Sequence, residues 1–442
     1  MSDGVKSFLK FVSLDELDYW DVKRYVITDI HSKFPLIKLS NLIQERSEKV
    51  KLFEEPEKLF AILGVNNKIG LFDAYEQYGN EINQAYKKVY DGDLAYNPYR
   101  INVGSIGLKT KELKNNFISP AYVVFSSNEK LNPNYLYKIF KTDTFNKIIN
   151  DNTTGSVRQN LKFDTLSNIK IPLPTIEEQN KLLEKYNYKI ALAQEQEQEA
   201  KDIEQSIEEY LFEELGIEKI EEKEKSSKLQ FVESKNLDRW DIWTLNYKYL
   251  SNKYTINFLK NIVTEKPLYG ANEKGIKKIT DTRYIRITDI NEDGHLNDEI
   301  ISPENVDEKF LLKENDFLIA RSGNTVGKTF LYKNIYGRAI YAGYLVKYVL
   351  DVQKIIPDYL LYFTKSLYYK NWIQGNQRVS GQPNINGQEF LYSPIILPPM
   401  NIQEKITTEI SKRKEKIKKL KQQAIKNRED AIKEFEEEIF TK

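Results

Sequence analysis

One stretch occurs twice and decides how the chain is organised: Ile171-Pro172-Leu173-Pro174-Thr175-Ile176-Glu177-Glu178-Gln179-Asn180-Lys181-Leu182 and Ile395-Ile396-Leu397-Pro398-Pro399-Met400-Asn401-Ile402-Gln403-Glu404-Lys405-Ile406. The copies lie 224 positions apart in a chain of 442 residues. In each copy a short apolar strand ends at a proline, which fixes φ and cannot donate to a β-ladder. A turn rich in Glu or Gln then opens a long helix, where such residues suit the positive end of the helix dipole. The sequence therefore predicts one unit used twice: a globular domain, a proline hinge and a long helix.

The repeat sets the expected domain boundaries and fold class. Short β-branched and aromatic runs separated by Gly, Asn and Asp predict strands at Tyr284–Ile290, Asp316–Ala320 and Ala339–Val349. Prolines near the start of Pro133–Asn150 and Pro357–Gln374 favour one helix in each of those segments. We expect an α+β fold with two tandem globular domains. The predicted boundaries are 1–175 for the first domain, 176–216 for a long helix, 217–236 for a connector, 237–400 for the second domain and 401–442 for the second helix.

Both long helices carry an apolar stripe with a spacing of three to four residues. In the second helix the stripe runs from Ile406 to Ile439 and is interrupted by Arg413 and Asn427, and in the first helix the polar stretch Gln194–Glu199 divides it. Each helix of about 40 residues would be about 60 Å long, so it cannot bury its stripe within its own domain. We expect the two helices to pack on each other as a coiled coil.

Charge supports that pairing. Residues 176–225 hold seven Lys against fifteen Glu and one Asp, whereas residues 401–442 hold ten Lys and two Arg against eight Glu and one Asp. The helical regions therefore differ in sign, while the remainder of this chain of net charge +1 is basic. Basic globular parts suit a polyanion such as nucleic acid, although the excess is also ordinary for a soluble domain.

Composition excludes several kinds of site. There is no cysteine, so disulfides, zinc–cysteine sites and thiol chemistry are excluded. The only two histidines, His31 and His295, are expected at the surface and make a histidine-based metal site or catalytic triad improbable. No apolar stretch has the length of a signal sequence core or a membrane span, so we expect a cytoplasmic protein without a membrane partner.

Two motifs resemble catalytic signatures but are incomplete. Ser322–Thr329 ends in Gly-Lys-Thr like a phosphate-binding loop, yet Ser322 stands where the first glycine is required, and Phe330–Tyr332 favours a strand instead of a helix. The segment fits either a loop directed at DNA or an ordinary hairpin turn. Asn97-Pro98-Tyr99-Arg100 lacks the second proline of the adenine-methyltransferase signature, and no glycine-rich loop for S-adenosylmethionine precedes it. We predict no catalysis at either segment.

Loops in both halves carry side chains of the types that contact base edges and phosphates. We align Val103–Gly107 with Gly323–Gly327, and Thr154–Gly155 followed by Asn160 with Ser380–Gly381 followed by Asn384. A single such residue is more often only a solvated surface residue, and the paired occurrence is what favours a site. The candidates are Asn97, Arg100, Asn102, Ser105, Lys109, Arg158, Gln159 and Asn160 in the first half, and Arg283, Arg286, Arg321, Ser322, Asn324, Lys328, Arg378, Gln382 and Asn384 in the second.

The hinges, the paired glycine–asparagine loops and the Arg321–Lys328 loop together resemble the specificity subunit of type I restriction–modification enzymes, over essentially the whole chain. The resemblance implies two target recognition domains that each read half of a bipartite double-stranded DNA site, and helices that pair as an antiparallel coiled coil. It also implies two adenine methyltransferase subunits and restriction–motor subunits as partners. The chain itself would bind no cofactor, because S-adenosylmethionine, ATP and Mg²⁺ would belong to those partners.

Two other interpretations remain open. A DNA-recognition subunit of another modification or defence system would share these motifs. A coiled-coil scaffold without DNA binding would explain the helices, but not the paired loops with Arg, Asn and Gly.

Overall fold

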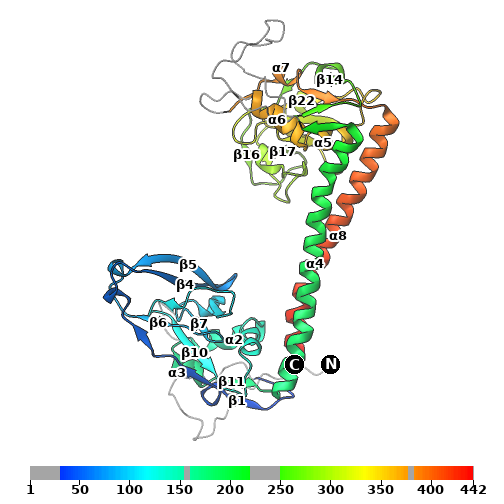
Figure 1. The fold of residues 1–442 in the computed structure, drawn as a ribbon. Helices are drawn as coiled ribbons and strands as arrows, with labels where there is room; N and C mark the ends of the chain where they lie inside the picture. Colours follow the sequence, from blue (N-terminus) through cyan, green and yellow to red (C-terminus); the bar gives the residue numbers. More distant parts are fainter. Residues whose placement is uncertain (1–29, 154–159, 220–248, 377–382, 442) are drawn as a thin grey trace, which may run out of the picture. The chain divides into compact units, whose positions relative to one another are not determined.

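The computed structural model describes residues 30–153, 160–219, 249–376 and 383–441. The chain divides into two compact units, unit 1 formed by Met1–Glu197 with Lys421–Lys442, and unit 2 formed by Gln198–Leu420. Each unit holds one globular domain together with part of each long helix (Figure 1). The α+β class and the tandem arrangement predicted from the sequence are confirmed.

The same four-stranded antiparallel sheet is present in both units. Its strands follow the same order and the same pairing, and the central strands are buried in each case. In unit 1 the order is β2 (Ile43–Glu45), β10 (Val123–Ser127), β7 (Leu94–Tyr96) and β8 (Ile106–Leu108). In unit 2 it is β15 (Leu268–Tyr269), β22 (Leu345–Val349), β19 (Asp316–Ala320) and β20 (Thr329–Leu331).

The turn before each central strand is also duplicated. Gly92 has φ +88° and Asn315 has φ +71°, and glycine and asparagine tolerate this left-handed conformation best. Buried Asp93 and Asp316 follow, and each carboxylate accepts a hydrogen bond of 2.9 Å from a backbone N–H three residues earlier. Local turn chemistry therefore starts β7 and β19 in the same way.

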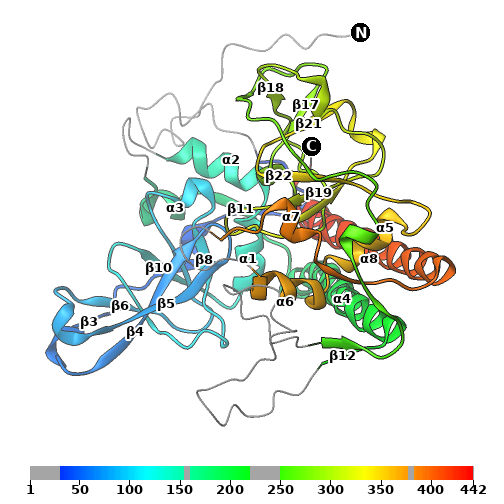
Figure 2. The same ribbon diagram turned by 90° about the horizontal axis from the view of Figure 1, so that it is seen from above.

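The additional strands differ between the units. Unit 1 has a five-stranded sheet in the order β3 (Lys49–Val50), β6 (Tyr86–Lys88), β9 (Phe117–Ile118), β4 (Leu59–Asn66) and β5 (Gly70–Tyr78), of which β3, β4, β5 and β6 are labelled in Figure 2. Unit 2 instead pairs β16 (Gly275–Ile276) with β18 (Ser302–Pro303), and β17 (Arg283–Ile285) with β21 (Ala339–Tyr341). Outside the repeated framework, the two halves have thus diverged.

Short elements connect these strands. They are η3 (Leu39–Asn41), η4 (Leu52–Glu54), η5 (Gly79–Glu81), η6 (Ile101–Val103), η8 (Leu259–Asn261), η9 (Ile287–Asp289), η10 (Glu308–Phe310), η11 (Asn334–Tyr336), α3 (Phe163–Ser167), α7 (Gly387–Phe390), and the paired strands β12 (Ile217–Lys219) and β13 (Tyr249–Ser251).

The strand expected over Tyr284–Ile290 was too long, because the Asp289 side chain accepts a bond from the Arg286 N–H and closes η9. The strand expected over Ala339–Val349 is two strands, β21 and β22, separated by a turn at Ala342–Tyr344.

The prediction of a single helix in each domain was wrong in one respect. Each of these segments forms two helices joined by a corner. In unit 1 these are α1 (Pro133–Ile139) and α2 (Asp143–Asn152), and in unit 2 they are α5 (Pro357–Phe363) and α6 (Leu367–Asn376). At the corner, the hydroxyls of Thr142 and Ser366 donate to the carbonyls of Ile139 and Phe363 at 2.7 Å. The same hydroxyls accept from the first turn of the next helix. A side-chain cap of this kind ends one helix and starts another.

The predicted proline hinges are duplicated in atomic detail. Strand β11 (Lys170–Pro172) pairs with β1 (Leu36–Lys38), and β23 (Pro394–Ile396) pairs with β14 (Ile256–Phe258). Just beyond the hinges, Gln179 and Gln403 are fully buried. Each donates from Nε2 to two carbonyls, at 2.9 and 2.9 Å for Gln179 and at 2.9 and 3.1 Å for Gln403. Each Oε1 also accepts from a backbone N–H at 2.8 Å, so the glutamine joins the hinge to the domain.

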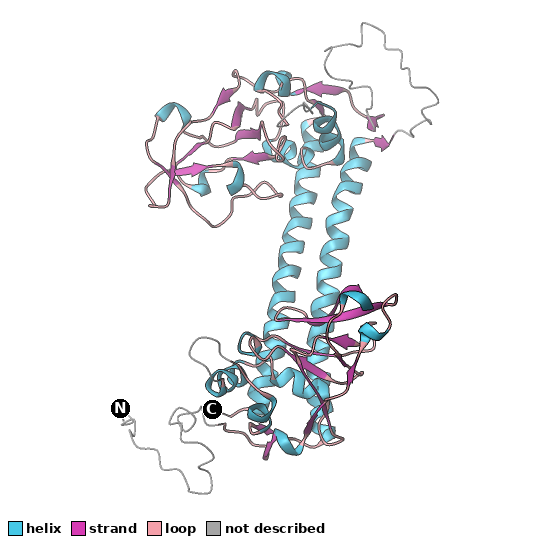
Figure 3. Ribbon diagram, turned by 90° about the vertical axis from the view of Figure 1, so that its left-hand side faces the viewer, coloured by secondary structure: helices cyan, strands magenta, loops and turns pink. Residues whose placement is uncertain are grey.

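The two long helices are α4 (Ile176–Leu215) and α8 (Met400–Ile439), each of 40 residues (Figure 3). In unit 1 the ion pairs Lys185–Glu438, Lys189–Glu434 and Glu197–Arg428 join them. In unit 2 the ion pairs Glu199–Lys416 and Glu214–Lys405 do so. Within each unit the residue numbers rise along one helix while they fall along the other, so the pairing is antiparallel.

The polar residues that interrupt the stripes make contacts between the helices. Arg413 donates from Nη1 to the Ser206 carbonyl at 2.7 Å and lies over the Tyr210 ring. Asn427 donates to Gln196 at 2.9 Å. Polar contacts at a helix–helix seam restrict its register. The stretch Gln194–Glu199 therefore does not end α4.

Each domain core is completed by the end of a long helix. In unit 1, Phe435 and Ile439 of α8 pack with Leu182 and Tyr135. In unit 2, Leu211 and Leu215 of α4 pack with Ile406 and Ile410, together with the sheet residue Phe317. Phe435 and Ile439 lie 224 positions after Leu211 and Leu215, so this closure belongs to the repeat. No helix among the described residues is long and apolar enough to cross a membrane.

Candidate nucleic-acid interface

The loop with the incomplete phosphate-binding signature joins β19 to β20 as an antiparallel hairpin. Its backbone is fixed at both ends, because Gly327 N–H donates to the Ala320 carbonyl at 2.8 Å and Ile385 N–H donates to the Arg321 carbonyl at 3.0 Å. Gly323 and Gly327 have φ of +78° and +83°. The segment is therefore a rigid hairpin loop followed by a strand, and it lacks the helix that a P-loop requires.

Arg321 is the most distinctive side chain of this loop. Its guanidinium carbon lies 5.0 Å from the centre of the Tyr269 ring and 6.0 Å from that of Tyr344. Stacking on aromatic faces holds the planar group in one orientation. The buried Nε of Arg321 has no hydrogen-bond partner among the described residues. Because this Nε is buried, only the terminal guanidinium nitrogens of Arg321 can serve an acceptor from outside the unit.

The loop borders a depression of about 1070 Å³ in unit 2. Four residues predicted from the sequence line it: Arg286, Arg321, Ser322 and Lys328. Its other walls are formed by the segments 269–275, 287–288 and 342–344, which carry Tyr269, Tyr344 and Glu273. An open surface with a preoriented arginine and flanking lysine is chemically suited to phosphates and base edges.

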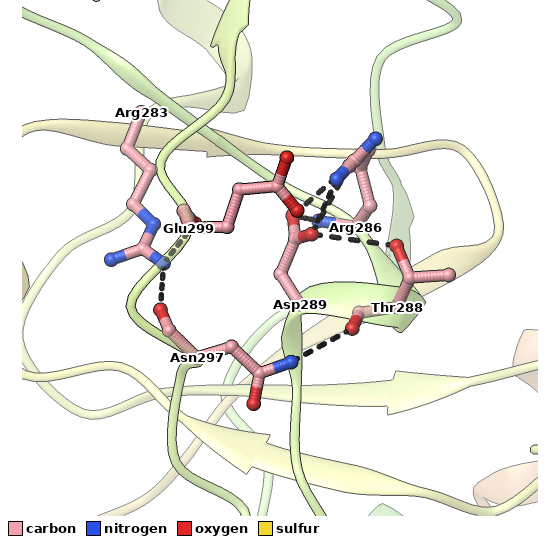
Figure 4. Close-up of polar contacts among 6 residues, drawn as sticks. All are labelled: Arg283, Arg286, Thr288, Asp289, Asn297 and Glu299. Carbon is pink, nitrogen blue, oxygen red and sulfur yellow. Dashed lines mark hydrogen bonds and ion pairs between the residues drawn. The ribbon is translucent and has the colours of Figure 1, made fainter. Parts of the chain in front are cut away.

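Two of the predicted arginines are engaged within unit 2, as Figure 4 shows. Arg283 donates from Nη2 to the carbonyls of Asn297 at 2.7 Å and Glu299 at 3.1 Å. Arg286 contacts Asp289 from Nε and Nη2, at 2.6 Å for Nη2 to Oδ1, and this carboxylate raises the pKa of the arginine. Both arginines hold the η9 region together, and only Arg286 also lines the depression.

Lys328 and three neighbouring predicted residues have different surroundings. The Lys328 ammonium lies 3.1 Å from the carboxylate of Glu292, with its side chain only 13 % exposed and that of Glu292 94 % exposed. Ser322 is buried and forms a β-bridge with Asn384, whereas Asn324 is exposed at the tip of the loop. The residues chosen from the sequence thus include Lys328 on the charged side of the loop and Ser322, whose bridge to Asn384 fixes the base of the loop.

In unit 1 the matching hairpin loop connects β7 to β8. The sequence alignment of this loop was shifted, because the strand registers place Gly104 opposite Gly327, not opposite Asn324. Gly104 and Gly327 have φ of +82° and +83°, and each lies two residues before the return strand. On this register Ser105 corresponds to Lys328, and Pro98 corresponds to Arg321. The Pro98 carbonyl accepts from Leu161 N–H at 2.9 Å, as the Arg321 carbonyl accepts from Ile385.

The predicted residues of this loop are unequal in exposure. Arg100 is exposed, and Asn97 accepts from the Tyr99 N–H at 3.0 Å in a local turn. Asn102 is half-buried in η6. Ser105 is buried and donates to the Val65 carbonyl at 3.4 Å. Lys109 is 2 % exposed and its ammonium contacts Asp91, Thr110 and Leu113, so this lysine stabilises the domain and is not presented to a ligand.

The second pair of predicted loops is described only in part. Asn160 and Asn384 are half-buried beside the two hairpin loops, and the buried Oδ1 of Asn160 has no partner among the described residues. Arg158, Gln159, Arg378 and Gln382 lie outside the described residues.

Tyr269, Tyr344 and Glu292 were missed by sequence reasoning. Tyr269, in strand β15, and Tyr344, in the turn before β22, lie 52 and 23 positions from Arg321, and only the sheet order brings them to it. No group of three or more His, Asp or Glu side chains in the described part of the chain could hold a metal ion.

Comparison with protein families decides what these two units are. The model of the type I restriction modification DNA specificity domain matches residues 60–204 and 262–427, once in each half of the chain. The chain belongs to this family. A search of curated protein sequences gave no match. The loops described above therefore lie in DNA specificity domains of the type I restriction–modification kind.

One solved structure with a TM-score above 0.5 shows a similar fold, and two others are similar to a lesser degree. A chain from a structure described as "Structural basis underlying complex assembly and conformational transition of the type I R-M system" is 15 % identical, with a TM-score of 0.60, over 92 % of this chain and 97 % of that one. The HsdS subunit from Thermoanaerobacter tengcongensis is 15 % identical, with a TM-score of 0.48, over 92 % and 96 %. The S subunit from M. genitalium is 12 % identical, with a TM-score of 0.45, over 93 % and 97 %.

Proposed function

We propose that this chain is the specificity subunit of a type I restriction–modification enzyme and recognises a bipartite target in double-stranded DNA, one half-site with each unit. The observation that carries the proposal is the hairpin loop of unit 2, where the guanidinium of Arg321 lies over the rings of Tyr269 and Tyr344 and borders the depression. Arginine is the side chain that most often reads guanine in the major groove, through two donors in one plane. The matching loop of unit 1, with the exposed Arg100, would read the other half-site.

The paired helices would serve as the spacer between the half-sites and as the scaffold for partners. Two methyltransferase subunits would bind here, with restriction–motor subunits completing the enzyme in the cytoplasm. S-adenosylmethionine, ATP and Mg²⁺ would be bound by those partners, and the chain alone would have no methyltransferase, nuclease or ATPase activity. Support comes from the family match in both halves and from the structural relative, whose description concerns complex assembly of a type I system.

The test is to express the chain with a methyltransferase partner and to map the methylated adenines. Arg321→Ala should relax the sequence requirement in one half-site only, because one bidentate base contact contributes about 1–3 kcal/mol of discrimination. Arg338→Ala is a matched control, since Arg338 is an arginine of unit 2 that does not line the depression. Unchanged methylated sequences with Arg321→Ala, or relaxation in both half-sites, would contradict the assignment.

A further inference from the structure

A lysine occupies the corner between the two helices of each domain. Lys141 lies between α1 and α2, and Lys365, 224 positions later, lies between α5 and α6. Lys365 donates from Nζ to the Thr329 carbonyl at 3.1 Å. Lys141 donates to the Gly104 carbonyl at 3.0 Å and to the Ile106 carbonyl at 3.5 Å. On the register of the two sheets, Ile106 and Thr329 are the same position.

These carbonyls lie where the sheet cannot satisfy them. Strands β8 and β20 are each the last strand of their four-stranded sheet, so one side of their backbone has no ladder partner. Ile106 and Thr329 are the first residues of those strands and directly follow the hairpin loops 97–105 and 320–328. The lysine donor therefore fixes the point at which each loop re-enters the sheet.

The position of the lysine has an electrostatic cost. Burial lowers the pKa of Lys365 to about 7, and the nearby Lys414 lowers it further, with Lys328 acting in the same direction. Burial lowers the pKa of Lys141 as well. A neutral side chain would avoid this cost. Its occurrence in both halves, against the same backbone position, argues for a purpose beyond filling space.

In unit 2 the contact is enclosed further. A Cβ placed on Gly294 would lie 3.0 Å from the Lys365 ammonium and 3.1 Å from the Thr329 carbonyl, so the tight turn Asn291–His295 covers this bond. The same turn carries Glu292, which pairs with Lys328 in the loop, and Asp293, which pairs with Lys414 of α8 at 3.4 Å. The end of the loop is thereby held at two adjacent residues, Lys328 through its side chain and Thr329 through its backbone carbonyl.

We propose that Lys141 and Lys365 are positioning residues for DNA recognition: each fixes the return of one hairpin loop and thereby orients the loop's reading side chains, without contacting DNA itself. The inference rests on the proposed function of the loops. Thr329 immediately follows Lys328, and Gly327 N–H is bonded back to Ala320 beside Arg321, so a shift at Thr329 moves both ends of the loop. A tilted guanidinium loses bidentate geometry, and discrimination falls more than overall affinity.

The experiment uses the full chain assembled with its methyltransferase partner. Lys365→Met keeps the length of the side chain but removes the donor. Affinity is measured for the mapped target and for targets with one base changed in either half-site. We expect the ratio between correct and changed targets to fall about fivefold to tenfold for the half-site read by unit 2 and to stay unchanged for the other. Lys141→Met should give the opposite pattern.

Two further variants separate positioning from folding. Lys365→Arg retains a donor and should restore most of the ratio, because a guanidinium can reach the same carbonyl. Lys370→Met removes an exposed lysine of α6 and should change neither half-site. A purely structural loss would lower the fraction of active complex equally for all targets and would leave the ratio constant.

The outcomes distinguish this inference from the function on which it depends. If Arg321→Ala relaxes one half-site while Lys365→Met leaves every ratio unchanged, the positioning role is wrong and the loop assignment stands. If the assembled wild-type complex shows no sequence preference, or Arg321→Ala has no effect on it, the proposed function itself fails. A Lys365→Met variant that alters both half-sites equally also overturns the inference.

Discussion

The hairpin loops of the two units share a backbone but differ in the residue at its start. Both loops occupy nine residues between matched strand positions, both have a glycine with φ close to +82° as the next-to-last residue, and both accept a hydrogen bond at the same carbonyl. That carbonyl belongs to Pro98 in unit 1 and to Arg321 in unit 2. A proline presents no donor, whereas a stacked arginine presents a fixed one. The side chains that each loop presents can therefore differ between the units while the backbone framework stays the same.

The largest effect should come from the part of the framework that is alike. Gln403→Ala removes two donors and one acceptor of a fully buried side chain, leaving Ile356 N–H and two carbonyls without this partner. Each buried group left unpaired costs about 1–3 kcal/mol, so unit 2 should lose about 3–5 kcal/mol of stability. Gln179→Ala should cost unit 1 a similar amount. Urea unfolding monitored by probes in each unit measures both, and a twofold difference would show that the networks are not equivalent.

Gly104 and Gly327, the next-to-last residues of the two loops, should respond unequally to the same change. Gly327→Ala places a Cβ 2.7 Å from two carbons of Ile373, whereas the nearest atoms to a Cβ on Gly104 lie at 4.0 Å. Positive φ costs a side chain about 1–2 kcal/mol at either site, and overpacking adds about 1–3 kcal/mol at Gly327 alone. Thermal unfolding of Gly104→Ala and Gly327→Ala should therefore differ clearly. Equal losses would mean that helix α6 yields to the new methyl group.

Stability should depend on pH through the lysine at the corner of unit 2. The pKa of Lys365 is lowered to about 7 by burial, with Lys414 and Lys328 lowering it and Asp293 and Glu292 opposing them. Between pH 7 and the ordinary lysine pKa the unfolded chain binds more protons, so stability rises with pH over this range and the penalty is full below pH 7. The slope contributed is at most about 1.4 kcal/mol per pH unit.

Denaturant unfolding at pH 6.5, 7.5 and 8.5 measures this slope. Lys365→Met should flatten the curve relative to wild type, and Lys370→Met should not. If the Lys365→Met and wild-type curves remain parallel, the lysine titrates near its ordinary pKa and is more hydrated than its surroundings imply.

The smallest predicted effect concerns an ion pair that only unit 2 has at this position. Glu292 is the counter-ion of Lys328. In unit 1 the position of Lys328 is occupied by Ser105, whose side chain carries no charge. Glu292→Gln should release Lys328 for a phosphate and tighten DNA binding severalfold, with a salt slope larger by about one. In a Lys328→Ala background the change should have no such effect. Tightening that persists in the double variant would reflect general charge and not competition for this lysine.

Features that depend on local chemistry and repetition could be predicted from the chain without its structure. The proline hinges, the two 40-residue helices, the buried seam from Ile406 to Ile439 and the strand Asp316–Ala320 follow from composition and periodicity read along the chain. The hairpin loop Arg321–Lys328 was also predicted as a loop, because glycines, a lysine and an arginine between two strand runs leave few alternatives; its contact with DNA stays a prediction. The helix corners were missed, since one capping hydroxyl at Thr142 or Ser366 overrides a helical pattern on both sides.

Which polar residues are presented to a ligand, and which are used inside the domains, depended on tertiary contacts. Lys109, Arg283 and Arg286 are residue types that often contact DNA. In the structure their donors instead bind Asp91, Asn297 and Asp289 inside the domains. The register that pairs Pro98 with Arg321 comes from hydrogen bonds between strands, because a nine-residue loop can be aligned in several ways by its letters. Tyr269 and Tyr344 reach Arg321 only through the order of strands in the sheet. Contacts between residues far apart along the chain depend on how the strands pair into sheets, and the residue types alone do not specify this pairing.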